Sequence, residues 1–314
     1  MKETCVVGVD LGATNIRVAL ILKRGKILKR AREQTSNQGK SGVVVTNQII
    51  KLISNITKGE GQKSIAGIGI SSMGPLDHKK GGPQDAPNIA FSFIPLVKPL
   101  EQNFSLPVFL LKDTHAGVLA EKYFGEGKHA KNLVYITIST GIGGGAIVDN
   151  HLILGKSRNA AEIGHLLVDT KYSIPCTCRK GYGHWEGIAS GRNIPRFFTI
   201  WKNKENKKTN FKAKEAKDIF DAAKQHNKTA IAFLDELSKI NARAISDIIV
   251  AYDPELITIG GSVAFNNPQF TLKGIKNYVD HYLKIPRIEI TKLGDDIGLL
   301  GAAAAVFKKK EGSQ

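Results

Sequence analysis

The feature that most constrains this chain is a repeated pattern of strand, glycine turn and strand. The pattern occurs first around DLGATN (residues 10–15) and again around STGIGGG (139–145), and each copy continues into alternating strands and helices. A chain of 314 residues is also longer than a single hydrophobic core usually serves. The sequence therefore predicts two related α/β domains with a cleft between them.

Hydrophobic spacing locates the individual elements of both halves. In the first half it predicts strands at 5–12, 14–22, 25–33, 65–72 and 106–113, and helices at 42–56 and 115–124. In the second half it predicts strands at 133–139, 145–148, 151–154, 255–263 and 288–293, a glycine turn at 140–145, and helices at 213–225, 228–252, 270–283 and 296–310. The expected domains are residues 1–112 with 300–314, and residues 113–299.

Composition narrows the class of protein. The net charge of +17 is spread along the chain, and its one dense run, residues 202–217, contains a single aromatic residue, Phe211, unlike the repeatedly interleaved aromatic residues of many nucleic-acid binders. This favours a solvated, lysine-rich surface that attracts phosphorylated ligands, and nucleic-acid binding is not expected. No apolar run is long enough to span a membrane, and 3 cysteines are too few for a disulfide scaffold. We expect a reduced, cytoplasmic protein.

The glycine turns do not fit the commonest nucleotide-binding loops. A P-loop would require glycine at positions 34 and 150, where Gln34 and Asn150 stand. The Gly141–Ala146 segment loosely matches a dinucleotide fingerprint, but that motif must open a helix, and here a strand and a hairpin turn follow. The protein-kinase signature set is also missing.

Two glycine turns facing each other could instead hold a polyphosphate through backbone N–H groups and threonine hydroxyls. Asp10 could hold Mg²⁺, directly or through water. A third glycine pair, after the strand at 255–259, would suit the close approach of a flat base. The expected ATP-binding residues are Asp10, Gly12, Ala13, Thr14, Asn15, Thr140, Gly141, Gly143, Gly144, Gly260, Gly261 and Ser262.

Four segments together resemble the repressor–ORF–kinase (ROK) family of sugar kinases, in its archaeal hexokinase and glucokinase branch. The segments are VGVDLGATNIRVAL, ISTGIGGGAI, LITIGGSVA, and AAEIGHLLVD with the following CTCRKGYGHWE. The resemblance implies two actin-like (ribonuclease H-like) ATPase domains and a homodimer. It also implies transfer of the γ-phosphoryl group of Mg-ATP to the 6-hydroxyl of glucose or a related hexose.

The resemblance also assigns sugar-site roles. It makes Asp113 the general base that takes the proton of the sugar hydroxyl, a role worth about 10²–10⁴ in rate. A structural alternative for Asp113 is a helix N-cap, and both roles can hold together. The family usually has asparagine at position 112, where this chain has lysine. Lys112 could grip the same hydroxyl, bind a substrate anion or point away. The expected sugar-binding residues are Gly74, Asn88, Lys112, Asp113, Glu162, His165 and Glu186.

The CTCRKGYGHWE segment, residues 176–186, has two further interpretations. A Cys-x-Cys disulfide would close a strained ring and is not expected in a reducing compartment. The resemblance implies a structural zinc held by histidine and three cysteines, and here the candidates are His165, Cys176, Cys178 and His184. Such a His₂Cys₂ set suits Zn²⁺, whereas the alternative is a packed loop without metal. Cys5 is expected to be a core thiol.

Three other functions remain open on the sequence alone. A sugar-responsive regulator of the same family would carry an N-terminal DNA-binding domain, and none is expected because the first phosphate strand begins within a few residues of Met1. An N-acetylhexosamine kinase would share the same motifs. A non-enzymatic actin-like polymer would not need the carboxylates at 113, 162 and 186.

Overall fold

The computed structural model describes residues 3–59, 65–87 and 89–311, which form two compact units. One unit runs up to Lys128 and resumes at Asp295, and the other spans His129–Gly294. The sequence placed this boundary before Asp113, but α3 (Asp113–Tyr123) falls in the first unit. The reason is close packing of α3 on α10 (Ile297–Glu311), where a Cβ added at Gly301 would lie 1.9 Å from the carbonyl oxygen of Ala116.

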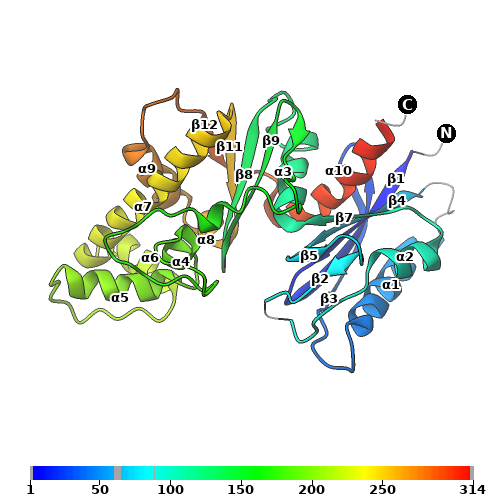
Figure 1. Ribbon diagram of the computed structural model, residues 1–314, viewed down its shortest axis with the longest axis horizontal. Coiled ribbons are helices and arrows are strands. Elements are labelled where there is room, and N and C mark those ends of the chain that lie inside the picture. Colours follow the sequence, from blue (N-terminus) through cyan, green and yellow to red (C-terminus); the bar gives the residue numbers. More distant parts are fainter. Residues whose placement is uncertain (1–2, 60–64, 88, 312–314) are drawn as a thin grey trace. The chain divides into compact units, whose positions relative to one another are not determined.

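The first unit is a five-stranded sheet in the order β3-β2-β1-β4-β7 (Figure 1). Its strands are β1 (Cys5–Leu11), β2 (Asn15–Leu22), β3 (Ile27–Gln34), β4 (Ile65–Ser72) and β7 (Val108–Lys112). β1 pairs antiparallel with β2 and parallel with β4. A separate small pair consists of β5 (Leu76–Asp77) and β6 (Gly82–Pro83).

Helices cover both faces of this first sheet. The apolar side chains of α1 (Val43–Thr57) and α2 (Val97–Phe104) share a core with alternate residues of β1. α10 lies on the other face, where a Cβ added at Gly69 would lie 1.8 Å from the carbonyl oxygen of Ala302. Glycine therefore lets the backbone of α10 approach the backbone of β4 directly.

The second unit repeats the first sheet. Its order is β10-β9-β8-β11-β12, with β8 pairing antiparallel with β9 and parallel with β11. The strands are β8 (Leu133–Ile138), β9 (Ile142–Val148), β10 (His151–Leu152), β11 (Leu256–Gly260) and β12 (Arg287–Ile290). Order and strand directions match those of the first sheet position by position, so the internal repeat predicted from the sequence is confirmed.

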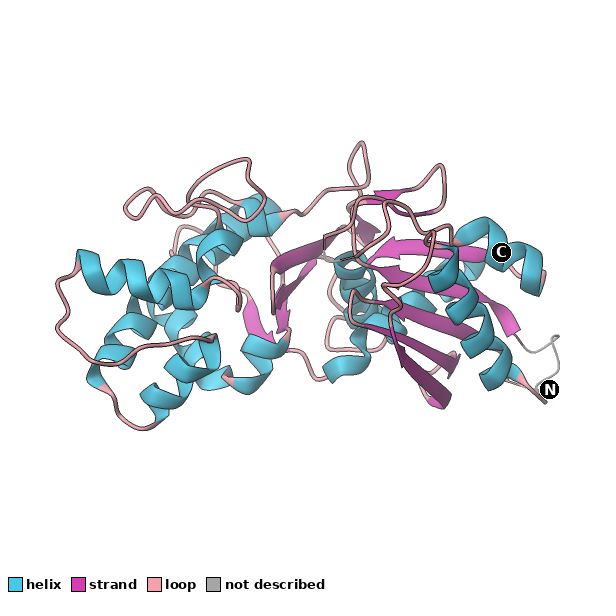
Figure 2. Ribbon diagram, turned by 90° about the horizontal axis from the view of Figure 1, so that it is seen from below, coloured by secondary structure: helices cyan, strands magenta, loops and turns pink. Residues whose placement is uncertain are grey.

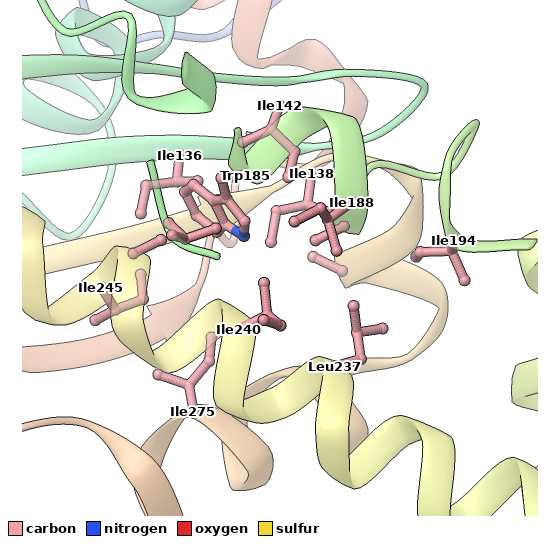
Figure 3. Close-up of a cluster of buried hydrophobic side chains, with 14 of the residues drawn as sticks. Ile136, Ile138, Ile142, Trp185, Ile188, Ile194, Leu237, Ile240, Ile245 and Ile275 are labelled. Atoms are coloured by element: carbon pink, nitrogen blue, oxygen red, sulfur yellow. The ribbon is translucent and has the colours of Figure 1, made fainter. Parts of the chain in front are cut away.

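Helices and loops form the rest of the second unit (Figure 2). The helices are α4 (Trp185–Ala189), α5 (Ile194–Lys204), α6 (Ala216–Lys224), α7 (Lys228–Tyr252), α8 (Ser262–Asn266), α9 (Pro268–Tyr278) and the 3₁₀ turn η2 (Ile163–His165). Isoleucines of β8 and α7 surround the fully buried indole of Trp185 (Figure 3), whose Nε1–H donates to Asn241 at 2.8 Å. α4 is thereby fixed to the core by its first residue.

The structure corrects two features of the expected layout. Gly143–Gly145 belong to β9 and not to a turn, because their backbones pair with Tyr135–Thr137 of β8. α5 was not among the helices predicted from hydrophobic spacing, and it extends into the basic run at 202–217. Among the residues that the structure describes, no helix is long and apolar enough to cross a membrane.

Candidate functional site

The first phosphate turn, residues 12–15, joins β1 to β2 as a tight connection. The N–H of Gly12 donates to the carbonyl of Asn15 at 3.0 Å, and the Thr35 hydroxyl donates to the carbonyl of Gly12 at 2.7 Å. Arg32 donates to the side-chain oxygen of Asn15 at 3.1 Å. Thr14 remains exposed at the tip. The turn is therefore braced by β3, with its threonine hydroxyl directed to solvent.

Asp10 lies at the end of β1, opposite Arg17 of β2. The guanidinium of Arg17 donates through Nε to Asp10 Oδ2 at 3.0 Å and through Nη2 to the same oxygen, while Nη1 donates to the carbonyl of Asp295. The other carboxylate oxygen, Oδ1, faces Gly298 in the first turn of α10. Sequence reasoning missed Arg17, although a short turn between two antiparallel strands already pairs positions 10 and 17.

The expected catalytic segment lies where β7 passes directly into α3. Lys112 precedes the helix in extended conformation, and Asp113 is its first residue. The Oδ1 of Asp113 accepts the N–H of Thr114 at 2.8 Å, but Lys112 occupies the N-cap position and no side chain caps the helix, so the N-cap alternative for Asp113 is wrong. A Cβ added at Gly74 would lie 3.9 Å from Cγ and Cδ of Lys112. Asn88 lies outside the described residues.

The second phosphate turn, residues 139–142, joins β8 to β9. Its backbone makes three hydrogen bonds to the segment that contains α4: Gly191 N–H donates to Ser139 O at 2.7 Å, Arg192 N–H donates to Thr140 O at 3.4 Å, and Ile142 N–H donates to Glu186 Oε2 at 3.0 Å. Thr140 is exposed, whereas Gly144 is buried inside β9 against Ile163. Gly144 is thus a packing position in this structure.

The third glycine element, residues 260–262, lies beside the second phosphate turn. Gly261 has a φ of 91° and precedes α8, and a Cβ there would lie 2.5 Å from the carbonyl oxygen of Ile138. The hydroxyls of Ser139 and Ser262 are 3.1 Å apart. Two segments that are far apart in the sequence therefore form one surface in the second unit.

The four residues expected to bind zinc lie together. The potential ligand atoms of His165, Cys176, Cys178 and His184 are all within 4.8 Å of one another. Cys178 Sγ lies 3.5 Å from His184 Nδ1, and Cys176 Sγ lies 3.9 Å from His165 Nδ1. A tetrahedral zinc with ligand bonds of about 2.0–2.3 Å separates its ligand atoms by about 3.3–3.8 Å, so these two distances match such a site, and separations of up to 4.8 Å would have to shorten by about 1 Å. The donor set and its spacing fit zinc.

The protonation of this cluster depends on burial. Burial raises the pKa of the Cys176 thiol. Burial, together with the neighbouring His165, lowers the pKa of His184, so the neutral imidazole that binds metal is favoured. A bound cation would favour the thiolate form of Cys176, which burial alone disfavours.

The remaining sugar-site candidates of the second unit surround this cluster. Glu162 precedes η2, whose last residue is His165. Glu186 is in the first turn of α4 and accepts a hydrogen bond from Thr177 at 3.3 Å as well as the one from Ile142. A Cβ at Gly164 would lie 2.1 Å from the carbonyl oxygen of Ile142. The EIGH segment (residues 162–165), the loop at residues 176–184, here called the Cys/His loop, and the second phosphate turn therefore pack together.

Each unit carries part of the expected site. The first unit carries the first phosphate turn, Gly74, Lys112 and Asp113, and the second unit carries the second phosphate turn, Glu162, Glu186 and the Cys/His cluster. Sequence reasoning missed the backbone hydrogen bonds from Gly191 and Arg192 to the second phosphate turn. No local signal in the sequence marks these bonds, because they join segments about fifty residues apart.

Comparison with known proteins agrees with this geometry. The glucokinase of Pyrobaculum calidifontis is 34% identical over 306 residues, covering 97% of this chain and 95% of its own. The ROK hexokinase of Thermus thermophilus, at 26% identity, superposes with a TM-score of 0.83 over 98% of this chain and 100% of its own.

A third relative was solved with ligands. The ROK family glucokinase of Streptomyces griseus, in complex with glucose and AMPPNP, is 27% identical, with a TM-score of 0.74 over 95% of this chain and 98% of its own. This chain shares the two-domain actin-like ATPase fold of these kinases. The ROK family pattern matches residues 6–309, and the chain therefore belongs to the ROK family.

Proposed function

We propose that this protein is an ATP-dependent hexokinase that transfers the γ-phosphoryl group of ATP to the 6-hydroxyl of glucose. The observation that carries the proposal is the full-length similarity to a glucokinase solved with glucose and an ATP analogue. The duplicated sheets add physical support, because each presents one glycine turn of the kind that binds phosphate. The 34% identical relative is also a glucokinase.

Asp113 acts as the general base in this proposal. A sugar hydroxyl is a weak nucleophile, and a carboxylate within hydrogen-bond reach takes its proton as the new P–O bond forms. The carboxylate stands on the first residue of α3, at the positive end of the helix dipole. Because the phosphoryl transition state is loose, positioning and charge neutralisation supply most of the remaining rate enhancement.

Asp10 is the residue that would hold Mg²⁺. Its Oδ2 accepts both hydrogen bonds from Arg17, which leaves Oδ1 as the oxygen available to a metal-bound water. Bound Mg²⁺ would neutralise negative charge on the ATP phosphates. Thr14 and Thr140 are both exposed, and their hydroxyls would donate to nucleotide phosphates.

A structural zinc belongs to the proposal as well, held by His165, Cys176, Cys178 and His184. Its place would be to fix the loop that carries His165 and leads into Glu186. The family resemblance further implies a homodimer. Multi-angle light scattering of the purified chain would give about twice the monomer mass of 34.1 kDa if this is right, and the monomer mass if it is wrong.

The test is a coupled ADP-release assay with Mg-ATP and one sugar at a time, run on the wild type and on Asp113→Asn. The sugars are glucose, mannose, fructose, glucosamine, N-acetylglucosamine and N-acetylmannosamine. We expect glucose-dependent turnover that falls by about 10²–10⁴ in the variant, because the base is lost while the side chain keeps its shape. Turnover with only the N-acetylated sugars would show that one of them, and not glucose, is the substrate. No turnover with any sugar would overturn the proposal.

A further inference from the structure

We propose that Glu186 is a positioning residue for the nucleotide, because its carboxylate holds the second phosphate turn in place. This role is separate from the sugar contact expected for Glu186, and it rests on the proposed kinase function. It makes the Cys/His loop, α4 and the ATP-binding turn one connected structure within the second unit.

The first support is the hydrogen bonding of the carboxylate itself. Oε2 accepts the backbone N–H of Ile142 at 3.0 Å, and a Cβ added at Gly141 would lie 2.6 Å from the same oxygen. The other oxygen, Oε1, accepts the hydroxyl of Thr177 at 3.3 Å. Thr177 stands between Cys176 and Cys178, so one side chain joins the metal-binding loop to the turn.

The second support is that the turn is held from its other side by the same segment. Just after α4, the N–H groups of Gly191 and Arg192 donate to the carbonyls of Ser139 and Thr140. The buried side chain of Asn193 donates to the backbone carbonyl of Glu186 at 3.0 Å, which ties the two ends of this segment together. Residues 139–142 are therefore fixed at both ends by a segment of eight residues that starts at Glu186.

The charge of Glu186 and its hydrogen bond to Ile142 have opposite effects on nucleotide binding. A carboxylate beside a turn that binds phosphate repels the nucleotide, so its charge works against binding. Its hydrogen bond works in favour, because an N–H left without a partner in a partly buried turn is unfavourable and frees the turn to move. The two effects can be separated by substitutions that remove the charge with and without the hydrogen-bond acceptor.

Glu186→Gln removes the charge and keeps an acceptor. The amide oxygen can still accept from Ile142, and the amide nitrogen can donate to the Thr177 hydroxyl, which also serves as an acceptor. Glu186→Ala removes both bonds. We therefore expect opposite outcomes for nucleotide binding: little loss or a gain with glutamine, and a clear loss with alanine.

The experiment measures ADP affinity by isothermal titration calorimetry, with Mg²⁺ present and without any sugar. We expect Glu186→Ala to weaken ADP binding roughly fivefold to tenfold, and Glu186→Gln to bind ADP within about twofold of the wild type or more tightly. Asp113→Asn is the matched control, because it lies in the other unit and should lose turnover while binding ADP normally. Glu186→Leu replaces the alanine variant if the latter melts near assay temperature.

Two results would overturn the inference while leaving the kinase in place. ADP affinity unchanged in Glu186→Ala, with only the KM for glucose raised, would limit Glu186 to the sugar. Equal weakening in the alanine and glutamine variants would mean that the hydrogen bond to Ile142 is not what matters. A wild type that binds no ADP would overturn the kinase proposal, and this inference with it.

Discussion

Lys112 is the residue whose expected place in the sugar site most affects the proposed substrate choice. It immediately precedes the expected base Asp113, and its aliphatic chain lies beside Gly74, which is expected to form the floor of the sugar site. A lysine in this place can donate to a sugar hydroxyl but cannot accept from one. A hydroxyl that accepts a hydrogen bond from Lys112 therefore has its own O–H free to donate a hydrogen bond to another group.

We predict that Lys112→Met raises the KM for glucose roughly threefold to tenfold, because a hydrogen bond from a charged donor is lost. The KM for ATP should stay unchanged. Steady-state kinetics with each substrate varied in turn would check this. Lys98→Met, an exposed lysine on α2, serves as the control for a lost charge, and equal behaviour of the two variants would show that Lys112 points away from the sugar.

Single residues also show which contacts a sequence can reveal. Asp10 and Arg17 face each other because a short turn at 12–14 fixes the register of β1 and β2, and that register follows from the pattern of the two strands. The bond between Glu186 and Ile142 had no such signal. It depends on how α4 packs on the core through Trp185, which spacing along the chain does not encode.

Among the elements, the Cys/His loop is the one that we expect to depend most on a bound group. Two single β-bridges stiffen it, Leu167 with His184 and Pro175 with Tyr182. Cys176 packs so closely on α4 that a Cβ at Gly187 would lie 2.9 Å from its Cα. A metal held by the four ligands would add cross-links to a loop that has little regular structure of its own.

We predict about one zinc per chain in the purified protein, measured by inductively coupled plasma mass spectrometry. Cys178→Ser should lose most of that metal and melt at a lower temperature, because one of four ligands is removed. Cys5→Ala is the matched control, since Cys5 is a buried thiol of β1 in the other unit and should keep the metal. Full zinc content in Cys178→Ser would contradict the ligand set.

The contact between α10 and the first sheet gives a second prediction at this scale. Gly69→Ala should lower the free energy of unfolding by about 1–3 kcal/mol, because its Cβ would meet the backbone of α10 at 1.8 Å. Gly59→Ala is the comparison: among the residues that the structure describes, no atom lies within 4 Å of a Cβ added there, and the positive φ of 84° is the source of strain. Urea unfolding followed by circular dichroism would measure both, and a smaller loss at Gly69 than at Gly59 would refute the argument.

Helices and strands were predictable where a single spacing of apolar residues dominates the segment. The apolar spacing of α7 predicted Lys228–Tyr252 as observed, and the continuous apolar run of β4 did the same for Ile65–Ser72. α5 was missed because its lysine-rich end resembles a loop, although Phe197, Phe198 and Trp201 are buried beneath it. Gly143–Gly145 looked like a turn because pairing with β8, and not side-chain propensity, makes them a strand.

On the scale of the whole molecule, the net charge of +17 should matter most for the nucleotide. A positive surface attracts the ATP anion over a distance set by the Debye length, which is about 10 Å at 0.1 M salt and about 3 Å at 1 M. Glucose carries no charge and is unaffected by this field. The two substrates therefore report separately on electrostatics and on the sugar site.

We predict that raising KCl from about 0.1 M to about 1 M increases the KM for Mg-ATP severalfold and changes the KM for glucose by less than about twofold. Initial rates at constant free Mg²⁺ would measure both. If the two constants rose together, salt would be acting on the fold or on catalysis, and the field would not be guiding ATP.

The matched strand order of the two sheets has a consequence for how such a protein can evolve. In the first unit, β3 ends at Gln34 and β4 begins at Ile65, but in the second unit β10 ends at Leu152 and β11 begins only at Leu256. That longer stretch contains α4 and six residues expected to contact sugar or metal: Glu162, His165, Cys176, Cys178, His184 and Glu186. Natural selection can therefore remodel this part of the expected site within one insertion, without altering the strand order of the duplicated sheets.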